Sequence, residues 1–416
     1  MTKLTITLVS CFLLFSCSEK PQSVFEWKSI ERSLQTEMIS VEDNGSITLP
    51  EGHFIFTKSL IMDGKQGIVI KGAGMNKTVL SFKNQTEGAQ GLLITNGKNI
   101  TLEDFTIEDA KGDNLKISET RNVILRRIRA QWTAGPSNAN GAYALYPVMC
   151  TNVLMEECEA IGSSDAGIYV GQSDSVVIRN NKAYWNVAGI ESENSRWVEI
   201  YGNEAWDNTG GLLIFDLPAL TQYGHTTKVY NNFLHDNNHE NFATPGNVVA
   251  TIPPGTGIII LATHDLELTE NKIVNNTTVG TAVVSYELVA ALNKDTKQTP
   301  NAIGGVQTMN NNYQMDSLYN PYPFRIHIHH NIYENSNWFP TLSHDIGKLF
   351  FFKSFMSVPD IAFDGIRPEG KPDAELCLHD NGEITFIDLD AAHEFKNLSK
   401  DAGKYNCAGV KIGLKQ

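Results

Sequence analysis

Three short stretches of the chain decide its fold: Ile168-Tyr169-Val170-Gly171, Ile190-Glu191-Ser192-Glu193 and Leu212-Leu213-Ile214-Phe215. Their first residues are 22 positions apart, and then 22 again. Ile258 follows 46 positions after Leu212, and Thr281 follows 23 later. Leu115 precedes Ile168 by 53 positions, and we interpret the gaps of 46 and 53 as two turns each. A period of 20–25 residues built from short β-rich runs predicts an all-β, right-handed parallel β-helix.

Asparagine recurs at two fixed places in this repeat. The first set lies 13 residues after a strand start, or at the matching place in the local pattern: Asn181, Asn203, Asn232, Asn271 and Asn331. The second set lies five residues further on: Asn186, Asn208, Asn237 and Asn276. A side-chain amide both donates and accepts hydrogen bonds, so stacked amides can bond to the coils above and below. We therefore interpret these asparagines as structural.

Strand alternation predicts which side chains leave the stack. Ile168 and Val170 should point inward, whereas Tyr169, Glu191 and Glu193 should point outward. Lys116 should lie on the same outer face, some turns away.

The N-terminus predicts export. Lys3 precedes the apolar stretch 4–15, which is too short to span a bilayer, and Leu14-Phe15-Ser16-Cys17 resembles a lipobox. We expect residues 1–16 to be a lipoprotein signal peptide and 17–23 a linker lipidated on Cys17. The mature protein would then be anchored to a membrane of the bacterial cell envelope, facing the periplasm or the exterior.

Charge and cysteine usage fit that compartment. The net charge of −14 argues against nucleic acid as a partner. Cys377 and Cys407 bracket the C-terminal tail and are predicted to form a disulfide. Cys150 and Cys158 either pair or are buried thiols.

The repeat pattern divides the mature chain into two parts. We expect a β-helix over residues 24–366, including an N-terminal cap, and a capping tail over 367–416. Three excursions, 217–227, 240–255 and 287–322, interrupt the stack. Such insertions collect on one face of a solenoid and often form its binding site.

Three stretches carry a resemblance to a known family: 70–75 (Ile-Lys-Gly-Ala-Gly-Met), 241–257 (from Asn-Phe-Ala to Ile-Pro-Pro-Gly-Thr-Gly) and the tail between Cys377 and Cys407. The chain resembles the pectate-lyase-like superfamily of carbohydrate-binding proteins and sugar hydrolases, which includes alginate epimerases and NosD-type copper accessory proteins. More narrowly, it looks like exported β-helix repeat proteins of unknown function. Their genes are often paired with one for an exported c-type cytochrome, so the resemblance implies such a redox partner.

Acidic sugars suggest one set of site residues. Lyases and epimerases of uronates need a positive group for the sugar carboxylate, a base and an acid. Lys116, Arg127 or Arg129 would supply charge, Tyr169 or a histidine would move protons, and Glu191 with Glu193 would hold a cation such as Ca²⁺. The alternative is that the two glutamates are a solvated strand face. The Asp-Pro-His-Asp run of alginate epimerases is absent.

Two further sets of residues extend this site. Glycoside hydrolysis needs two carboxylates, which Glu191 and Glu193 satisfy by spacing, and Asp165 and Asp216 are near in register. Tyr143 and Tyr146 would stack on sugar rings.

A histidine pair suggests a metal. His327 and His329 lie on one face of a strand in Arg325-Ile326-His327-Ile328-His329-His330, and imidazoles bind copper or zinc. No third ligand is close in sequence, which favours structural or surface histidines.

Two classes of function follow. The first is a β-helix that binds or modifies polysaccharide as a lyase, epimerase or hydrolase. The second is a non-catalytic accessory protein that works with an exported cytochrome or in NosD-like metal-site maturation. Whether the chain is an enzyme stays open at this point.

Overall fold

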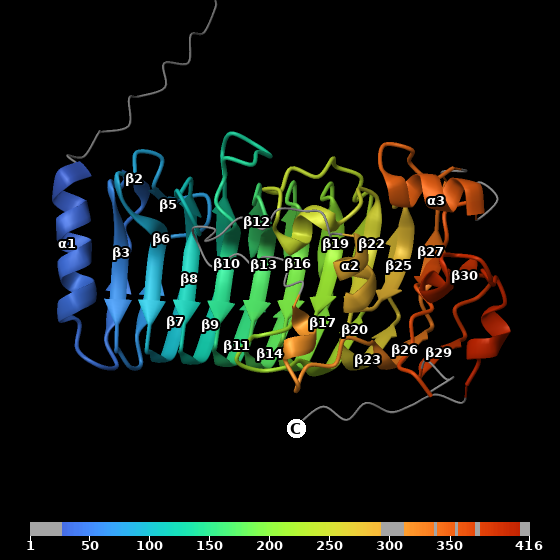
Figure 1. Cartoon of the computed structure of the whole chain (residues 1–416). Coiled ribbons are helices and arrows are strands. Elements are labelled where there is room, and N and C mark those ends of the chain that lie inside the picture. The colour runs from blue at the N-terminus through green and yellow to red at the C-terminus, as the bar shows by residue number, and fades with distance from the viewer. Residues whose placement is uncertain (1–26, 293–311, 337–338, 354–356, 371–374, 408–416) are drawn as a thin grey trace, which may run out of the picture.

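The computed structural model describes residues 27–292, 312–336, 339–353, 357–370 and 375–407, and they form a parallel β-helix. Figure 1 shows the coils stacked in chain order from the N-terminal to the C-terminal end. A regular coil contains three strands, such as β13 (Ala166–Gly171), β14 (Asp174–Arg179) and β15 (Lys182–Tyr184). The predicted signal peptide and the linker with Cys17 lie outside the described residues.

Equivalent strands of successive coils pair in parallel to give two sheets. Sheet B has 11 strands in the order β3 (Lys58–Asp63), β6 (Glu87–Thr95), β8 (Leu115–Ser118), β10 (Tyr143–Val148), β13, β16 (Ala188–Glu193), β19 (Gly210–Phe215), β22 (Thr256–Leu261), β25 (Val279–Val284), β28 (Ile361–Phe363) and β30 (Phe386–Asp388).

Sheet A has 19 strands, because it takes up to two strands from each coil. One series is β1 (Ser46–Thr48), β4 (Val69–Lys71), β7 (Lys98–Glu108), β9 (Arg121–Gln131), β11 (Thr151–Glu156), β14, β17 (Arg196–Tyr201), β20 (His225–Tyr230), β23 (His264–Thr269), β26 (Phe324–His329) and β29 (Leu376–His379). The other is β2 (Gly52–Ile55), β5 (Thr78–Ser81), β12 (Glu159–Ile161), β15, β18 (Glu204–Trp206), β21 (Phe233–His235), β24 (Lys272–Val274) and β27 (Ile332–Glu334), and β7 and β9 pair with both series.

Helices lie at the ends and in the excursions. The α-helices are α1 (Trp27–Ser40), α2 (Tyr286–Leu292) and α3 (Asp345–Lys353), and the 3-10 helices are η1 (Val248–Thr251), η2 (Tyr313–Met315), η3 (Ala391–His393) and η4 (Ala402–Tyr405). Helix α1 covers the first coil with the buried Leu34 and Met38 (Figure 1). A cap was predicted here, but its helix was not. None of the described helices is long and apolar enough to cross a membrane.

The pairing register corrects one interpretation of the spacing. Leu115 pairs with Leu145, which pairs with Ile168, so the gap of 53 residues is two turns as predicted. Leu212 pairs directly with Ile258, so the gap of 46 residues is one turn and not two. The prediction was wrong there because two excursions lengthen this coil without adding another.

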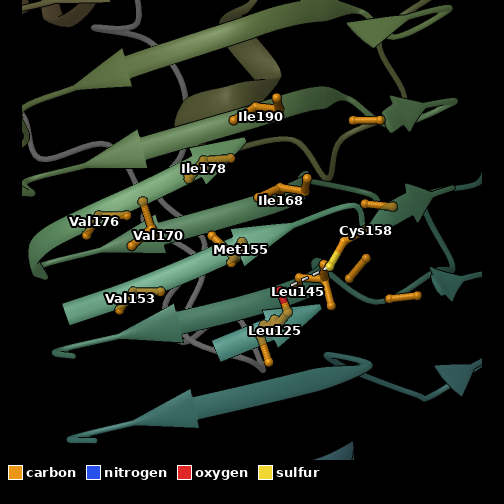
Figure 2. Packing of buried hydrophobic residues seen from close by; sticks show 14 of the residues in the cluster. Leu125, Leu145, Val153, Met155, Cys158, Ile168, Val170, Val176, Ile178 and Ile190 are labelled. Atoms are coloured by element: carbon orange, nitrogen blue, oxygen red, sulfur yellow. Dashed lines mark hydrogen bonds between the residues drawn. The ribbon is translucent and has the colours of Figure 1, made fainter. Parts of the chain in front are cut away.

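The interior of the stack is a continuous apolar core. Figure 2 shows Ile168, Val170 and Ile190 packing inside the coils, with Met155 and Cys158 beside them. These alternate with the outward-facing residues, as the sequence predicted. Cys150 and Cys158 are both buried and free, which settles the open alternative in favour of buried thiols.

Both asparagine sets form ladders inside the corners of the stack. Asn208 shows the pattern: its Nδ2 donates to Asn237 Oδ1 at 2.9 Å and to the Ala183 carbonyl at 3.0 Å. Its Oδ1 accepts from the backbone N–H and the Nδ2 of Asn186, both at 3.0 Å. The first set makes the same contacts and continues from Asn331 to Asn381. The structural interpretation is confirmed.

The stack continues past residue 366, where the sequence pattern led us to expect the tail to begin. Strand β29 pairs with β26, and β30 pairs with β28. The predicted disulfide between Cys377 and Cys407 is present, and it ties β29 to the segment after η4. The tail is therefore partly a further coil.

Candidate acid–base site on sheet B

The outer face of sheet B brings the predicted site residues into one row. Lys116 pairs with Tyr146, and Tyr169 pairs with Glu191. The rings of Tyr146 and Tyr169 meet edge to face, with centroids 4.9 Å apart, which joins the two pairs. The row exists because each of these residues is the outward position of its own strand. Four coils therefore contribute side chains to one site.

The carboxylates of this face are buried. Glu191, Glu193 and Asp165 are 2%, 1% and 2% exposed, so the alternative of a solvated strand face is excluded. The Tyr169 hydroxyl donates to Glu193 Oε1 at 2.8 Å, one coil away. A fourth carboxylate, Asp113, is fully buried nearby. We call the following side chains the acid–base cluster: Asp113, Asp165, Tyr169, Glu191 and Glu193.

Burial sets the protonation of these groups. Desolvation raises the pKa of Glu193 to about 7, against a smaller opposing effect of the Tyr169 hydrogen bond. It also raises the pKa of Asp113 to about 7, partly offset by the charge of Lys116. The pKa values of Asp165 and Glu191 are raised well above their ordinary values by burial, and then by the neighbouring carboxylates. Carboxyl groups with pKa values near neutrality are suited to both donating and accepting protons.

Three oxygens of the cluster have no hydrogen-bond partner within the described part of the chain. They are Asp113 Oδ1, Asp165 Oδ1 and Glu191 Oε2. An unpartnered buried polar atom is costly to stability, by about 1–3 kcal/mol. Such atoms are therefore expected mainly where a ligand or a reaction uses them.

Sequence reasoning missed Asp113. By register it lies level with Tyr143, since Leu115 pairs with Leu145. Its signal is an aspartate two residues ahead of a strand start in an otherwise apolar repeat.

The tyrosines predicted to stack on sugars pack against one another in this structure. Tyr143 lies 4.4 Å from Tyr146 and 4.5 Å from Tyr169, measured between ring centroids. Tyr143 and Tyr146 are buried, so no flat ring is presented to solvent here. Lys116 places its Nζ 4.4 Å from the centre of the Tyr146 ring and remains partly exposed, which makes it the accessible end of the row.

Asp216 has a structural contact. Its Oδ1 accepts from the Gly224 N–H at 2.8 Å, and its carbonyl accepts from the Tyr319 hydroxyl at 2.6 Å. It thereby fixes the excursion that follows β19 and links it to the segment after η2. Burial raises its pKa well above the ordinary value. Asp216 therefore borders the acid–base cluster as an anchor of the covering loops.

The described parts of the excursions collect on sheet B, as predicted. They pack on the apolar outward residues of β19 and β22, such as Leu213, Phe215 and Ile259. A cavity of about 100 Å³ lies beneath them, with almost entirely apolar walls that include Phe215 and Ile259 but no member of the acid–base cluster. The outer face of sheet B is therefore acidic over β13 and β16, in the middle of the sheet, and apolar over the next strands, β19 and β22.

The cation site predicted at Glu191 and Glu193 has fewer metal-binding side chains around it than expected. Among the described residues, three groups of metal-binding atoms converge to within 4.8 Å, and none of them includes Glu191 or Glu193. A Ca²⁺ ion at this pair would therefore need additional ligands. All three groups contain His327 or His329, on the outer face of sheet A.

The structure gives the histidine pair the neighbours that sequence reasoning did not find. His379 of β29 and Glu267 of β23 flank it from adjacent strands. His379 precedes Asn381 of the asparagine ladder by two residues, just as His329 precedes Asn331. That recurrence could have identified it from the sequence.

Known proteins match this fold. Residues 137–295 match the family model of the right handed beta helix region, in agreement with the parallel β-helix of the structure. The preneck appendage protein of Bacillus phage PZA is 25% identical over 257 residues, which cover 51% of this chain and 29% of the phage protein. The chain thus matches less than a third of this relative's length.

Solved structures are similar at lower identity. The mannuronan C-5 epimerase AlgE4 A-module of Azotobacter vinelandii is 14% identical, with a TM-score of 0.47, and the match covers 81% of this chain and 89% of that one. An exopolygalacturonase of Thermotoga maritima is 10% identical, with a TM-score of 0.46 and coverage of 81% of both chains. The cytochrome partner, the NosD-like role and the lipid anchor stay predictions.

Proposed function

We propose that the protein binds a polysaccharide and modifies it by proton transfer at the acid–base cluster. The observation that carries this proposal is the buried Tyr169–Glu193 pair, joined by a hydrogen bond of 2.8 Å, beside carboxyls whose pKa values are raised. A carboxyl with a pKa of about 7 is present in both protonation states at neutral pH. Glu193 can therefore accept a proton from a sugar or a water, or donate one to a leaving oxygen.

The surroundings of this pair suit an acidic or hydroxyl-rich ligand. The free oxygens of Asp165 and Glu191 would accept hydrogen bonds from sugar hydroxyls. Protonated, the same carboxyls would donate to a sugar carboxylate. Lys116, at the accessible end, would attract that carboxylate. Because Glu191 and Glu193 are no more than 2% exposed, the closed arrangement has to open before a sugar reaches them.

We also propose that the protein acts in the cell envelope, held by a lipid on Cys17. The lipobox-like Leu14-Phe15-Ser16-Cys17 supports this. Metabolic labelling with a fatty acid, compared between the wild type and Cys17→Ala, tests it: label must depend on Cys17.

The test of the reaction is proton NMR of the protein with a panel of polyuronates and neutral glycans, with and without Ca²⁺. New alkene signals identify a lyase, altered anomeric patterns without chain cleavage an epimerase, and new reducing ends without alkene signals a hydrolase. Glu193→Gln must abolish the change. A matched control is Glu199→Gln, because Glu199 also accepts from a tyrosine hydroxyl (Tyr230, 3.0 Å) but lies on sheet A. Unchanged spectra across the panel would contradict the proposal.

A further inference from the structure

The outer face of sheet A carries a compact group of imidazoles near its C-terminal end. Strands β23, β26 and β29 pair so that Glu267 lies beside His327, and His329 lies beside His379. The inward positions of β26 are Ile326 and Ile328, which belong to the core. The alternation therefore forces both histidines of β26 outward. We call His327, His329, His379 and Glu267 the histidine cluster.

The ring positions are unusually close for unlinked side chains. The ring centroids of His327, His329 and His379 are 4.1–4.8 Å apart. His327 Nε2 and His379 Nε2 are 2.6 Å from each other. His329 Nε2 lies 3.1 Å from Glu267 Oε1. Ligand atoms of Glu267, His327 and His329 thus lie within 4.8 Å of one another, and His379 joins His327 in a second, overlapping group.

We propose that the histidine cluster binds a transition-metal ion of the Zn²⁺ or Cu²⁺ class. Imidazole nitrogen and carboxylate oxygen are ligands that these ions favour, whereas Ca²⁺ and Mg²⁺ favour oxygen alone. Two nitrogens bound tetrahedrally to Zn²⁺ lie about 3.4 Å apart, given metal–nitrogen distances of about 2.1 Å. A small rotation of the His327 and His379 rings reaches that separation. The Cys377 sulfur lies within 4.8 Å of ligand atoms of His327 and His379, but it is bonded to Cys407 in the disulfide and is therefore not available as a thiolate ligand.

A second observation points to a ligand rather than to a surface patch. His379 directs Nε2 toward His327 and bonds through Nδ1 to Asp380 Oδ2 at 2.9 Å. A carboxylate on the far nitrogen orients a metal-binding imidazole and fixes its tautomer. His329 and His379 are partly exposed, with side-chain exposures of 13% and 19%, so an ion can enter. The overall charge of −14 also attracts cations.

The chain supplies a close control for this geometry. His235 of β21 also faces outward on sheet A with a side chain 18% exposed. Its Nδ1 bonds to Asp236 Oδ2 at 2.8 Å, as His379 does to Asp380, and its Nε2 lies 3.4 Å from Glu204 Oε1. It shares the carboxylate contacts of the cluster but has no second imidazole nitrogen within hydrogen-bond distance in the described structure. His235→Ala therefore removes a similar histidine without touching the proposed site.

The experiment is to equilibrate the full chain with Zn²⁺ or Cu²⁺ and to measure bound metal by mass spectrometry and affinity by titration. For Cu²⁺, electron paramagnetic resonance reports nitrogen ligands directly. We expect one ion per chain, nitrogen couplings in the Cu²⁺ spectrum, and a rise in melting temperature with Zn²⁺. We expect His379→Gln and His329→Ala to weaken binding at least tenfold, and Asp380→Asn to weaken it about tenfold. His235→Ala should leave it unchanged.

Three outcomes would overturn the proposal. The first is a wild-type chain that retains no ion, in which case the imidazoles are joined by N–H···N hydrogen bonds alone. The second is binding that persists in the His327→Ala, His379→Gln double variant, and the third is binding that is lost equally in His235→Ala. Circular dichroism of each variant shows whether it is folded. The electron paramagnetic resonance spectrum of a folded single variant, His329→Ala, separates loss of a ligand from loss of structure.

Discussion

The Tyr169 hydroxyl donates a hydrogen bond of 2.8 Å to Glu193 across two adjacent coils, with both side chains 1% exposed. The two residues are 24 positions apart in the sequence, so their separation alone does not predict the contact. The contact arises because the two side chains are outward positions of neighbouring strands, one two residues further along than the other. It places a proton donor on a carboxyl whose pKa burial has already raised.

Removal of that donor should reduce the proposed activity. In Tyr169→Phe the ring remains in its packing against Tyr143 and Tyr146, but Glu193 loses the hydroxyl. We expect the rate on the responsive glycan to fall by about a hundredfold, the range for loss of one acid–base partner. The fold should persist. Tyr230→Phe, which removes the hydroxyl bonded to Glu199, is the control and should retain the wild-type rate.

Stability should depend on pH through the same buried carboxyls. The folded protein holds protons on Glu193 and Asp113 up to a pH of about 7, whereas the unfolded chain releases them near its ordinary pKa values of 4.5 and 3.8. The folded state therefore binds more protons in this window, and its free energy of unfolding must fall as pH rises through it.

Glu193→Gln tests the size of this effect. The substitution should flatten part of the decline between pH 4.5 and 7 and raise the free energy of unfolding at pH 8, relative to the wild type, by on the order of 3 kcal/mol. Denaturant titrations at several pH values measure this. If Glu193→Gln and the wild type declined in parallel, Glu193 would not hold a proton in the folded state at neutral pH.

The sequence predicted the stack because two independent periodicities agree. The inward apolar residues and the asparagine corners repeat with the same spacing, and each is required by the coil itself. The prediction from sequence was wrong or incomplete where a segment of the chain lies outside the regular coils. The excursions between Leu212 and Ile258 made one turn look like two, and helix α1 lacks the repeat altogether.

The sequence predicted which face of the sheet carries the site, but not all of the residues that form it. Strand alternation placed Tyr169, Glu191 and Lys116 on one outer face, and the structure confirms this. Which residues lie beside them depends on the exact length of every intervening coil. Asp113 was missed for that reason, and the burial of Glu191 could not be read from an alternating pattern that is equally typical of exposed strands. His379 was missed although its place two residues before a ladder asparagine matches that of His329.

The two free thiols should be unreactive while the protein is folded. Burial raises the pKa of Cys150 to about 11 and that of Cys158 to about 12. Alkylation requires the thiolate, so little reactive form exists at pH 8. We expect peptide mapping after iodoacetamide treatment to find neither cysteine labelled in the native chain, and both labelled in denaturant without reductant. Rapid labelling of native Cys158 would show that the core beside it opens.

The asparagine ladder should be sensitive to the loss of one amide in its middle. Asn208→Ala removes the acceptor of the Asn186 N–H and Nδ2 and the donor to the Ala183 carbonyl. These groups lie in the dry interior of the corner, so we expect a loss of about 2–4 kcal/mol in the free energy of unfolding. Asn152→Gly is the matched control, because Asn152 also donates to an asparagine of an adjacent coil (Asn122, 2.8 Å) but at an exposed position, and glycine tolerates its backbone φ of +57°. It should cost less than about 1 kcal/mol, since water replaces the lost contact. Equal losses for the two variants would mean that the ladder is held by backbone pairing and that its amides add little.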